Sequence, residues 1–183
     1  MGLVMKVGSY CAVIGLLCFA TMAVAGEAEF EVCQGTSENA VIRAANCDLA
    51  IRMGGLSNEQ MIVALFNRGQ AALADEKPDK ALEDFDAILK LAPDDTKALY
   101  TRGIARRQLK QFDGALADFD RLLTLNYQPA AKIYLNRSMV HFLTGNKEKN
   151  LADLDTASRL APNDREITDR LWKTKRFYDQ EGR

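Results

Sequence analysis

An Asp-x-Asp pair occurs three times in this chain, and paired carboxylates are the groups that calcium sites use. The pairs are Asp84 with Asp86, Asp118 with Asp120, and Asp153 with Asp155. On a helix, residues two apart point about 200° away from each other, so the two carboxylates of one pair cannot hold the same ion. We therefore predict no metal site at these pairs.

Arginines recur in step with the aspartates, at Arg68, Arg102 and Arg137. We predict an ion pair inside each repeat, from the arginine on a first helix to an aspartate on a second helix. Such a pair adds little net stability unless it is partly buried. The recurring charges are thus expected to be structural.

No arrangement of residues indicates catalysis. His141 is the single histidine, and it stands beside Phe142 in a segment that looks packed. A lone histidine there is more often a filler than a base. Phosphate-binding glycine loops, Gly-x-Ser-x-Gly and His-Glu-x-x-His are absent. We expect no enzyme activity, no catalytic residue and no cofactor.

Residues 1–25 have the features of a secretory signal peptide. Lys6 precedes an apolar run over residues 7–25, which ends in Ala23-Val24-Ala25. The alternative is an uncleaved anchor in the inner membrane, because the run approaches the ~20 residues that span a bilayer. Both readings place the rest of the chain outside the cytoplasm, and we expect it in the periplasm.

Two cysteines remain after residues 1–25, Cys33 and Cys47. An even count in an exported chain predicts a disulfide, and closing a loop of about 15 residues is worth on the order of 3 kcal/mol. The alternative is two reduced, partly buried thiols. The pair lacks Cys-x-x-Cys spacing, so a thiol oxidoreductase is not expected.

The overall charge is close to neutral. The 183 residues carry a formal net charge of -1, and residues 1–25 hold one lysine and no acid. Binding of nucleic acid as the main activity is therefore not expected, since it requires a basic excess. The length suits a single domain with a substantial core.

The chain repeats one pattern with a period of 34 and then 35 residues. A fixed period in this range indicates a solenoid of stacked helical hairpins, which leaves a concave surface for binding. We expect three repeats within residues 58–163, at about 62–95, 96–129 and 130–163. Residues 26–57 are expected to form an N-terminal arm and a degenerate half-repeat, and residues 164–183 a C-terminal capping helix.

Local signals predict the helices within this frame. Residues 27–36 are expected to form an extended arm pinned at Cys33, and Ser37 to cap a helix that ends at Gly54-Gly55. In the half-repeat, Cys47 is placed in register with Phe85. Ser57 with Gln60 forms a capping box. The further helices are expected at about 58–74, 78–91, 96–109, 112–125, 130–144 and 147–160, with a last one from a cap at Asn163 to Tyr178.

The repeated residues resemble tetratricopeptide repeats. The resemblance covers about residues 62–163. It lies in the helix–turn–helix unit and in four sets of positions: Gly69, Gly103 and Ser138; Ala81 and Ala115; Phe85, Phe119 and Leu154; and Pro93 and Pro162. It implies an all-α, right-handed α-solenoid and a protein-interaction scaffold without chemistry of its own. The Asn-Arg-Gly and Asp-Phe-Asp pattern of the repeats also resembles that of small envelope proteins of Gram-negative bacteria. Three departures are Leu65 and Leu99 at the usual tryptophan position, Arg106 for a tyrosine, and Asn150 for the small alanine.

In this family the first helix of each repeat lines the groove. Carried over by position, the partner-binding residues are Phe66, Gln70, Leu73, Lys97, Tyr100, Ile104, Arg107, Lys132, Leu135, Met139 and Phe142. The expected ligand is an extended or helical protein segment with apolar anchors and some acidic character. The alternative is that neighbouring helices bury about half of these side chains. A family-type carboxylate clamp is not expected, because only Lys132 stands in a matching place.

A second functional reading remains open. The chain is alternatively a structural or assembly subunit that acts through self-association or contacts in a membrane complex. The last helix mixes basic and aromatic residues and suits an anionic membrane surface or an acidic partner, or else is a solvated cap. Its residues are Arg170, Trp172, Lys173, Lys175, Arg176 and Phe177.

Overall fold

The computed structural model describes residues 29–35 and 40–181, and every regular element in this part of the chain is a helix. The expected signal peptide, Ser37 and the last two residues lie outside the described residues. The chain divides into two compact units, Met1–Asp75 and Glu76–Arg183. None of the described helices is long and apolar enough to cross a membrane.

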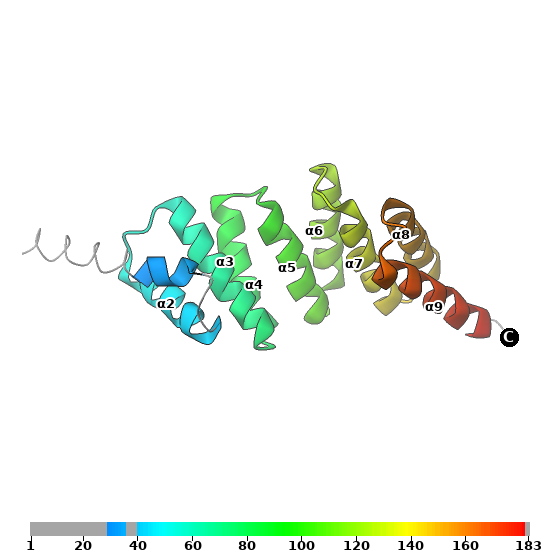
Figure 1. Ribbon diagram of the computed structural model, residues 1–183, viewed down its shortest axis with the longest axis horizontal. Helices are drawn as coiled ribbons and strands as arrows, with labels where there is room; N and C mark the ends of the chain where they lie inside the picture. The colour runs from blue at the N-terminus through cyan, green and yellow to red at the C-terminus, as the bar shows by residue number, and fades with distance from the viewer. Residues whose placement is uncertain (1–28, 36–39, 182–183) are drawn as a thin grey trace, which may run out of the picture. The chain divides into compact units, whose positions relative to one another are not determined.

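The first unit is built around a buried disulfide. A short helix over residues 29–34 precedes α2 (Ala40–Met53) and α3 (Asn58–Ala74) (Figure 1). Cys33 and Cys47 are bonded, with their Cα atoms 4.7 Å apart, and both are fully buried. The amide nitrogen of Asn67 donates to the carbonyl oxygen of Cys33 over 3.0 Å. The described residues of this unit therefore share a core that the disulfide crosses.

The extended arm predicted over residues 27–36 is wrong for the residues described. Residues 29–34 are helical because Phe30 and Cys33, three apart, lie on one face and are both buried, while Glu31 on the other face is exposed. The alternation of apolar and acidic residues is too short to distinguish a helix of fewer than two turns from a strand. The packing of this segment around the disulfide favours the helix over the strand.

The second unit is a stack of antiparallel helices. Each helix packs against the next one in the chain, and α5 also contacts α7 (Figure 1). The helices are α4 (Pro78–Leu91), α5 (Thr96–Gln108), α6 (Phe112–Thr124), α7 (Ala130–Leu143), α8 (Lys147–Leu160) and α9 (Arg165–Glu181). The arrangement is the expected α-solenoid, and the predicted helices are confirmed within a few residues at their ends.

The helix ends follow the predicted capping signals with one exception. Ser57 and Gln60 form the capping box, and Asp95 accepts a hydrogen bond from the backbone nitrogen of Ala98. The cap of the last helix is Asp164, not Asn163, because its carboxylate accepts from the backbone nitrogens of the two residues that follow Arg165. Both residues are good N-caps, so the sequence could not choose between them.

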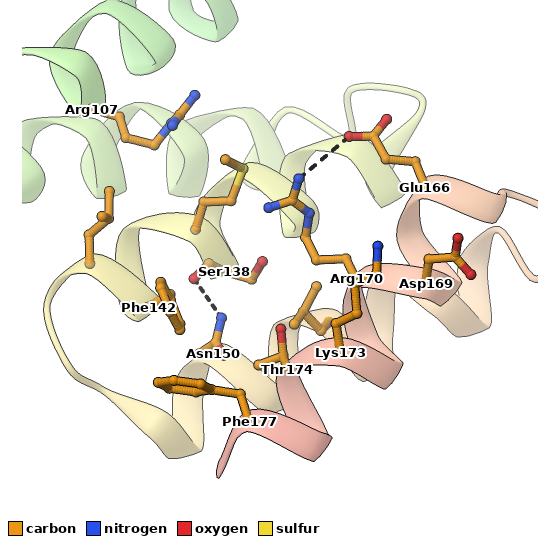
Figure 2. A pocket seen from close by; sticks show the side chains of 13 residues that line it. Arg107, Ser138, Phe142, Asn150, Glu166, Asp169, Arg170, Lys173, Thr174 and Phe177 are labelled. Carbon is orange, nitrogen blue, oxygen red and sulfur yellow. Dashed lines mark hydrogen bonds and ion pairs between the residues drawn. The ribbon is translucent and has the colours of Figure 1, made fainter. Parts of the chain in front are cut away.

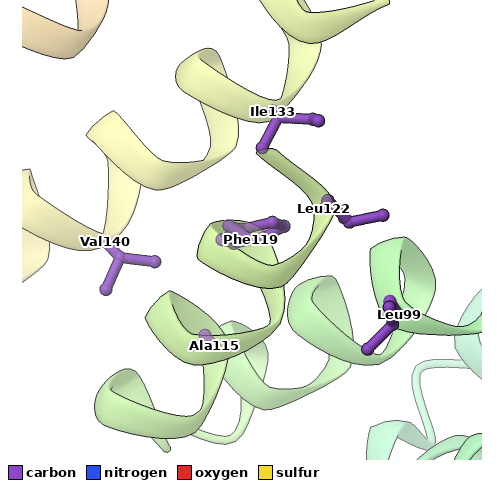
Figure 3. Close-up of a cluster of buried hydrophobic side chains, with 6 residues drawn as sticks. All are labelled: Leu99, Ala115, Phe119, Leu122, Ile133 and Val140. Atoms are coloured by element: carbon purple, nitrogen blue, oxygen red, sulfur yellow. The ribbon is translucent and has the colours of Figure 1, made fainter. Parts of the chain in front are cut away.

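Aromatic and branched side chains fill the core of the second unit. Phe85, Phe119 and Leu154, which share one position in the repeat, are each fully buried. One cluster joins α5, α6 and α7 through Leu99, Ala115, Phe119, Leu122, Ile133 and Val140 (Figure 3). A single helical hairpin could not bury this surface alone, so the cluster ties consecutive hairpins together.

The ring of Phe119 lies against Gly103, and this contact requires glycine. A Cβ added at Gly103 would stand 2.8 Å from a ring carbon of Phe119. In the next repeat, the equivalent position is Ser138, and the smaller Leu154 takes the place of the ring. Side chains at these two positions are thus matched in size within each repeat.

We predict that Gly103→Ser lowers the free energy of unfolding by about 1–3 kcal/mol, because overpacking forces the helices apart. Adding Phe119→Leu, which reproduces the pair of the next repeat, should recover part of that loss. Urea denaturation of the two single variants and the double variant, followed by circular dichroism, measures this coupling. Strictly additive losses would contradict the matched-size account.

Candidate functional site

The recurring arginines link helices of adjacent repeats. Arg102 donates from Nε and Nη2 to the two carboxylate oxygens of Asp118, over 3.0 and 2.6 Å. Its Nη1 donates to Asp86 on the preceding second helix over 2.7 Å. The predicted ion pair within the repeat is confirmed here, and the second link, to the repeat before, was not foreseen.

Arg137 makes the same two links. It donates to both oxygens of Asp153 over 2.8 and 2.6 Å and to Asp120 over 2.6 Å. The hydrogen bonds that Arg137 donates to Asp153 raise the pKa of its guanidinium, against the opposing effect of burial. In the first unit, Arg68 donates to Asp48 over 2.8 Å, which agrees with a half-repeat preceding the full ones. Asp118 and Asp120 therefore pair with different arginines, whereas Asp155 pairs with Lys175.

We predict that Arg137→Ala lowers the free energy of unfolding by about 2–3 kcal/mol, because it leaves Asp153 buried without its bidentate partner. The matched change Asp120→Asn should cost less than about 1 kcal/mol, since that carboxylate is 58% exposed. Chemical denaturation of both variants tests the contrast. Equal losses of unfolding free energy would show that burial does not determine how strongly these ion pairs stabilise the fold.

A groove of about 650 Å³ lies elsewhere in the second unit, where α5, α7, α8 and α9 meet (Figure 2). Aromatic, apolar and basic side chains line it together. They are Arg107, Ser138, Met139, Phe142, Leu143, Asn150, Leu154, Glu166, Asp169, Arg170, Lys173, Thr174 and Phe177.

One end of the groove is aromatic. Phe142 of α7 and Phe177 of α9 meet edge to face, with ring centroids 5.8 Å apart (Figure 2). Tyr178 lies behind them, 5.4 Å from Phe177. Phe142 and Phe177 are 45% and 42% exposed, so much of each ring is open to solvent. Exposed aromatic pairs of this kind provide apolar contact area for a ligand.

The other end carries polar groups without partners. Arg107 of α5 and Arg170 of α9 both line the groove, and the Nε atom of each is buried without a hydrogen bond among the described residues. Burial, and then the nearby charge of Arg170, lower the pKa of Arg107. On the floor, Asn150 is 2% exposed and donates to the carbonyl oxygen of Ser138 over 2.8 Å, but its Oδ1 has no partner.

The structure brings three of the predicted groove residues to this site, Arg107, Met139 and Phe142. The other predicted residues of α5 and α7 do not line it. Leu135 is buried at 5% exposure. Tyr100 is packed against Phe119, 6.5 Å between centroids, and its hydroxyl accepts a hydrogen bond from an amide. The remaining ones are Lys97, Ile104 and Lys132 on these helices, and Phe66, Gln70 and Leu73 on α3 of the first unit.

The prediction missed the contribution of α9. Six of the lining residues come from this helix, among them Arg170, Lys173 and Phe177. The signal was present in the sequence, because Pro162-Asn163-Asp164 repeats Pro93-Asp94-Asp95, which precedes α5. This alignment makes α9 the first helix of a further repeat, so its inner face continues the groove.

Comparison with known families agrees with this architecture. A sequence profile of the tetratricopeptide repeat matches residues 69–132. Residues 69–132 of the chain therefore contain tetratricopeptide repeats. A comparison with curated protein sequences finds no significant match.

Solved structures with the same repeats share the fold. MamA (residue 41 to the end) from Desulfovibrio magneticus RS-1 is 20% identical with a TM-score of 0.72, and the match covers 86% of each chain. YrrB, described as having an unusual peptide-binding site, is 22% identical with a TM-score of 0.63, over 73% of this chain and 66% of that one. The first repeat domain of Spaghetti (RPAP3), bound to the HSP90 peptide SRMEEVD, is 24% identical with a TM-score of 0.59, over 66% of this chain and 94% of that one.

His141 is a packing residue of α7. It is 7% exposed, and its Nε2 lies 3.8 Å from a carboxylate oxygen of Asp153. Burial lowers the pKa of the imidazole, and the Arg137 charge acts in the same direction. In the described part of the chain, no three His, Cys, Asp or Glu side chains gather as metal ligands.

Proposed function

We propose that this protein is a non-catalytic scaffold that binds a segment of a partner protein in the groove between α5, α7, α8 and α9. The observation that carries the proposal is the composition of the groove: exposed aromatic rings at one end and unpartnered polar atoms at the other. Binding sites for peptides combine these two kinds of surface, apolar anchors and a few fixed polar groups. The peptide-binding site described for YrrB and the peptide complex of Spaghetti (RPAP3) support the same class of ligand.

The proposal includes a location in the cell envelope. It is supported by the sequence of residues 1–25 and by the disulfide between Cys33 and Cys47, because such bonds persist in oxidising compartments. Mass spectrometry of the protein from a fractionated native host should find a chain that begins at Gly26 in the periplasmic fraction. A full-length chain in the cytoplasmic fraction would refute this location.

We expect partner protein to crosslink at the aromatic end of the groove. A photo-reactive phenylalanine analogue placed at Phe142 or Phe177 should capture a partner in cells, because both rings are exposed in the groove. The matched control is Leu160, which is 55% exposed on α8 but does not line the groove. Capture that is equal at all three positions, or absent from both phenylalanines, would contradict the proposal.

One observation favours the alternative, a subunit that self-associates. Trp172 of α9 is 60% exposed, with the Arg176 guanidinium 5.3 Å from its ring centroid. The alternative predicts a fixed oligomer by light scattering that Trp172→Ala dissociates, with crosslinks to a second copy of the chain. The scaffold proposal predicts a monomer and crosslinks to another protein.

A further inference from the structure

We infer that the segment bound in the groove is extended and carries one aspartate or glutamate side chain between Arg107 and Arg170, next to an apolar side chain held by Phe142 and Phe177. This inference deepens the proposed function and rests on it. It names the chemistry of the ligand, which the proposal itself leaves open.

Arg107 differs from its neighbours on α5. Arg102 and Arg106 both form ion pairs with Asp118, at 2.6 and 3.0 Å. The side chain of Arg107 has no hydrogen bond or ion pair among the described residues, although its Nε is buried. A partly buried guanidinium without a counter-ion is costly, and the cost is recovered when an anion binds.

Arg170 faces the same groove from α9, and its Nε also lacks a hydrogen bond among the described residues. Its ion pair with Glu166 is long, at 4.0 Å, and that carboxylate is 64% exposed. Burial, and then the charge of Arg170, lower the pKa of Arg107, as expected for two cations that line the same groove. A carboxylate between them would accept hydrogen bonds from both and remove the repulsion. Charge-assisted bonds of this kind are about twice as strong as neutral ones.

The charges around the groove favour a single carboxylate over an acidic run. Arg107, Arg170 and Lys173 are basic, whereas Glu166 and Asp169 are acidic. One positive charge is therefore left in excess, and a second ligand carboxylate would meet the two acids. We accordingly assign the anion to one side chain of an internal segment, and a free C-terminus is an outcome that the test distinguishes.

The floor of the groove favours an extended ligand. The unpartnered Oδ1 of Asn150 is a buried acceptor, and it requires a donor from the ligand. An extended segment presents free backbone N–H groups, whereas a helix uses them internally. In Figure 2, Asn150 lies beside Phe142 and above Phe177, with Arg170 higher in the view. A backbone N–H between the acidic and the apolar residue would reach it.

Fluorescence polarisation with defined peptides tests the inference. The probes are short, labelled Gly-Ser peptides with blocked ends that contain one Phe and one Glu, with Glu at successive positions on either side of Phe. Each has a matched version with Gln in place of Glu. At the preferred spacing we expect the Gln version to bind about tenfold more weakly or worse, because hydrogen bonds to a charged group are lost.

Variants of the protein test which residues cause the preference for Glu over Gln. Arg107→Gln and Arg170→Gln should each remove the preference for Glu over Gln without lowering the melting temperature, because neither arginine supports the fold through an ion pair with a buried carboxylate. Arg165→Gln is the matched control, since it removes an exposed charge from α9 outside the groove. It should change neither the preference for Glu over Gln nor the melting temperature. A variant that melts earlier would instead indicate a structural role and contradict the inference.

The remaining outcomes separate this inference from the proposed function. Phe-dependent binding that is equal for Glu and Gln peptides would overturn the carboxylate while leaving the groove proposal intact. Tighter binding of a Phe peptide with a free C-terminus and no Glu would overturn the assignment to a side chain. Absence of binding by every peptide would overturn the inference, and the crosslinking at Phe142 and Phe177 would then decide the proposed function separately.

Discussion

The ring of Phe119 touches the backbone of Gly103, and the stack of helices in the second unit depends on such close approaches. A first helix can lie against its second helix at this distance only where one of the two facing residues is small. The third repeat meets the same constraint with Ser138 and a fully buried Leu154. Because each pair of helices is fitted in this way, the first helices stand side by side and their other faces remain available to form a groove.

The ion pairs between arginine and aspartate follow the same stacking of helical hairpins. Arg102 and Arg137 each bridge an aspartate of their own repeat and one of the repeat before, so the ion pairs run between hairpins as well as within them. The aspartates that receive the bidentate bonds are nearly buried, with side chains 3% and 7% exposed. Burial of both partners is what makes these pairs structural. Against this regular pattern, the side chain of Arg107 has no ion pair among the described residues.

The last helix changes what the groove can bind. By its alignment with α5, α9 is a first helix that lacks a second helix in the described chain, and Trp172 stands where Gly103 does. A large residue is tolerated there because the described residues place no helix against that face, and Trp172 remains 60% exposed. The opposite face of α9 brings Arg170, Lys173 and Phe177 to the groove. The helix expected to cap the solenoid therefore also provides part of the candidate groove.

Periodicity in the sequence was enough to determine the helices, their order and the core position shared by Phe85, Phe119 and Leu154, because a stack of similar hairpins repeats the same local contacts at a constant interval. It also determined which arginines pair within a repeat. The tertiary structure decided which polar side chains have no partner, since pairing depends on residues brought together from several helices. Arg106 and Arg107 are neighbours in the sequence, and only packing shows that Arg106 meets the buried Asp118 whereas Arg107 lines an open groove together with Arg170.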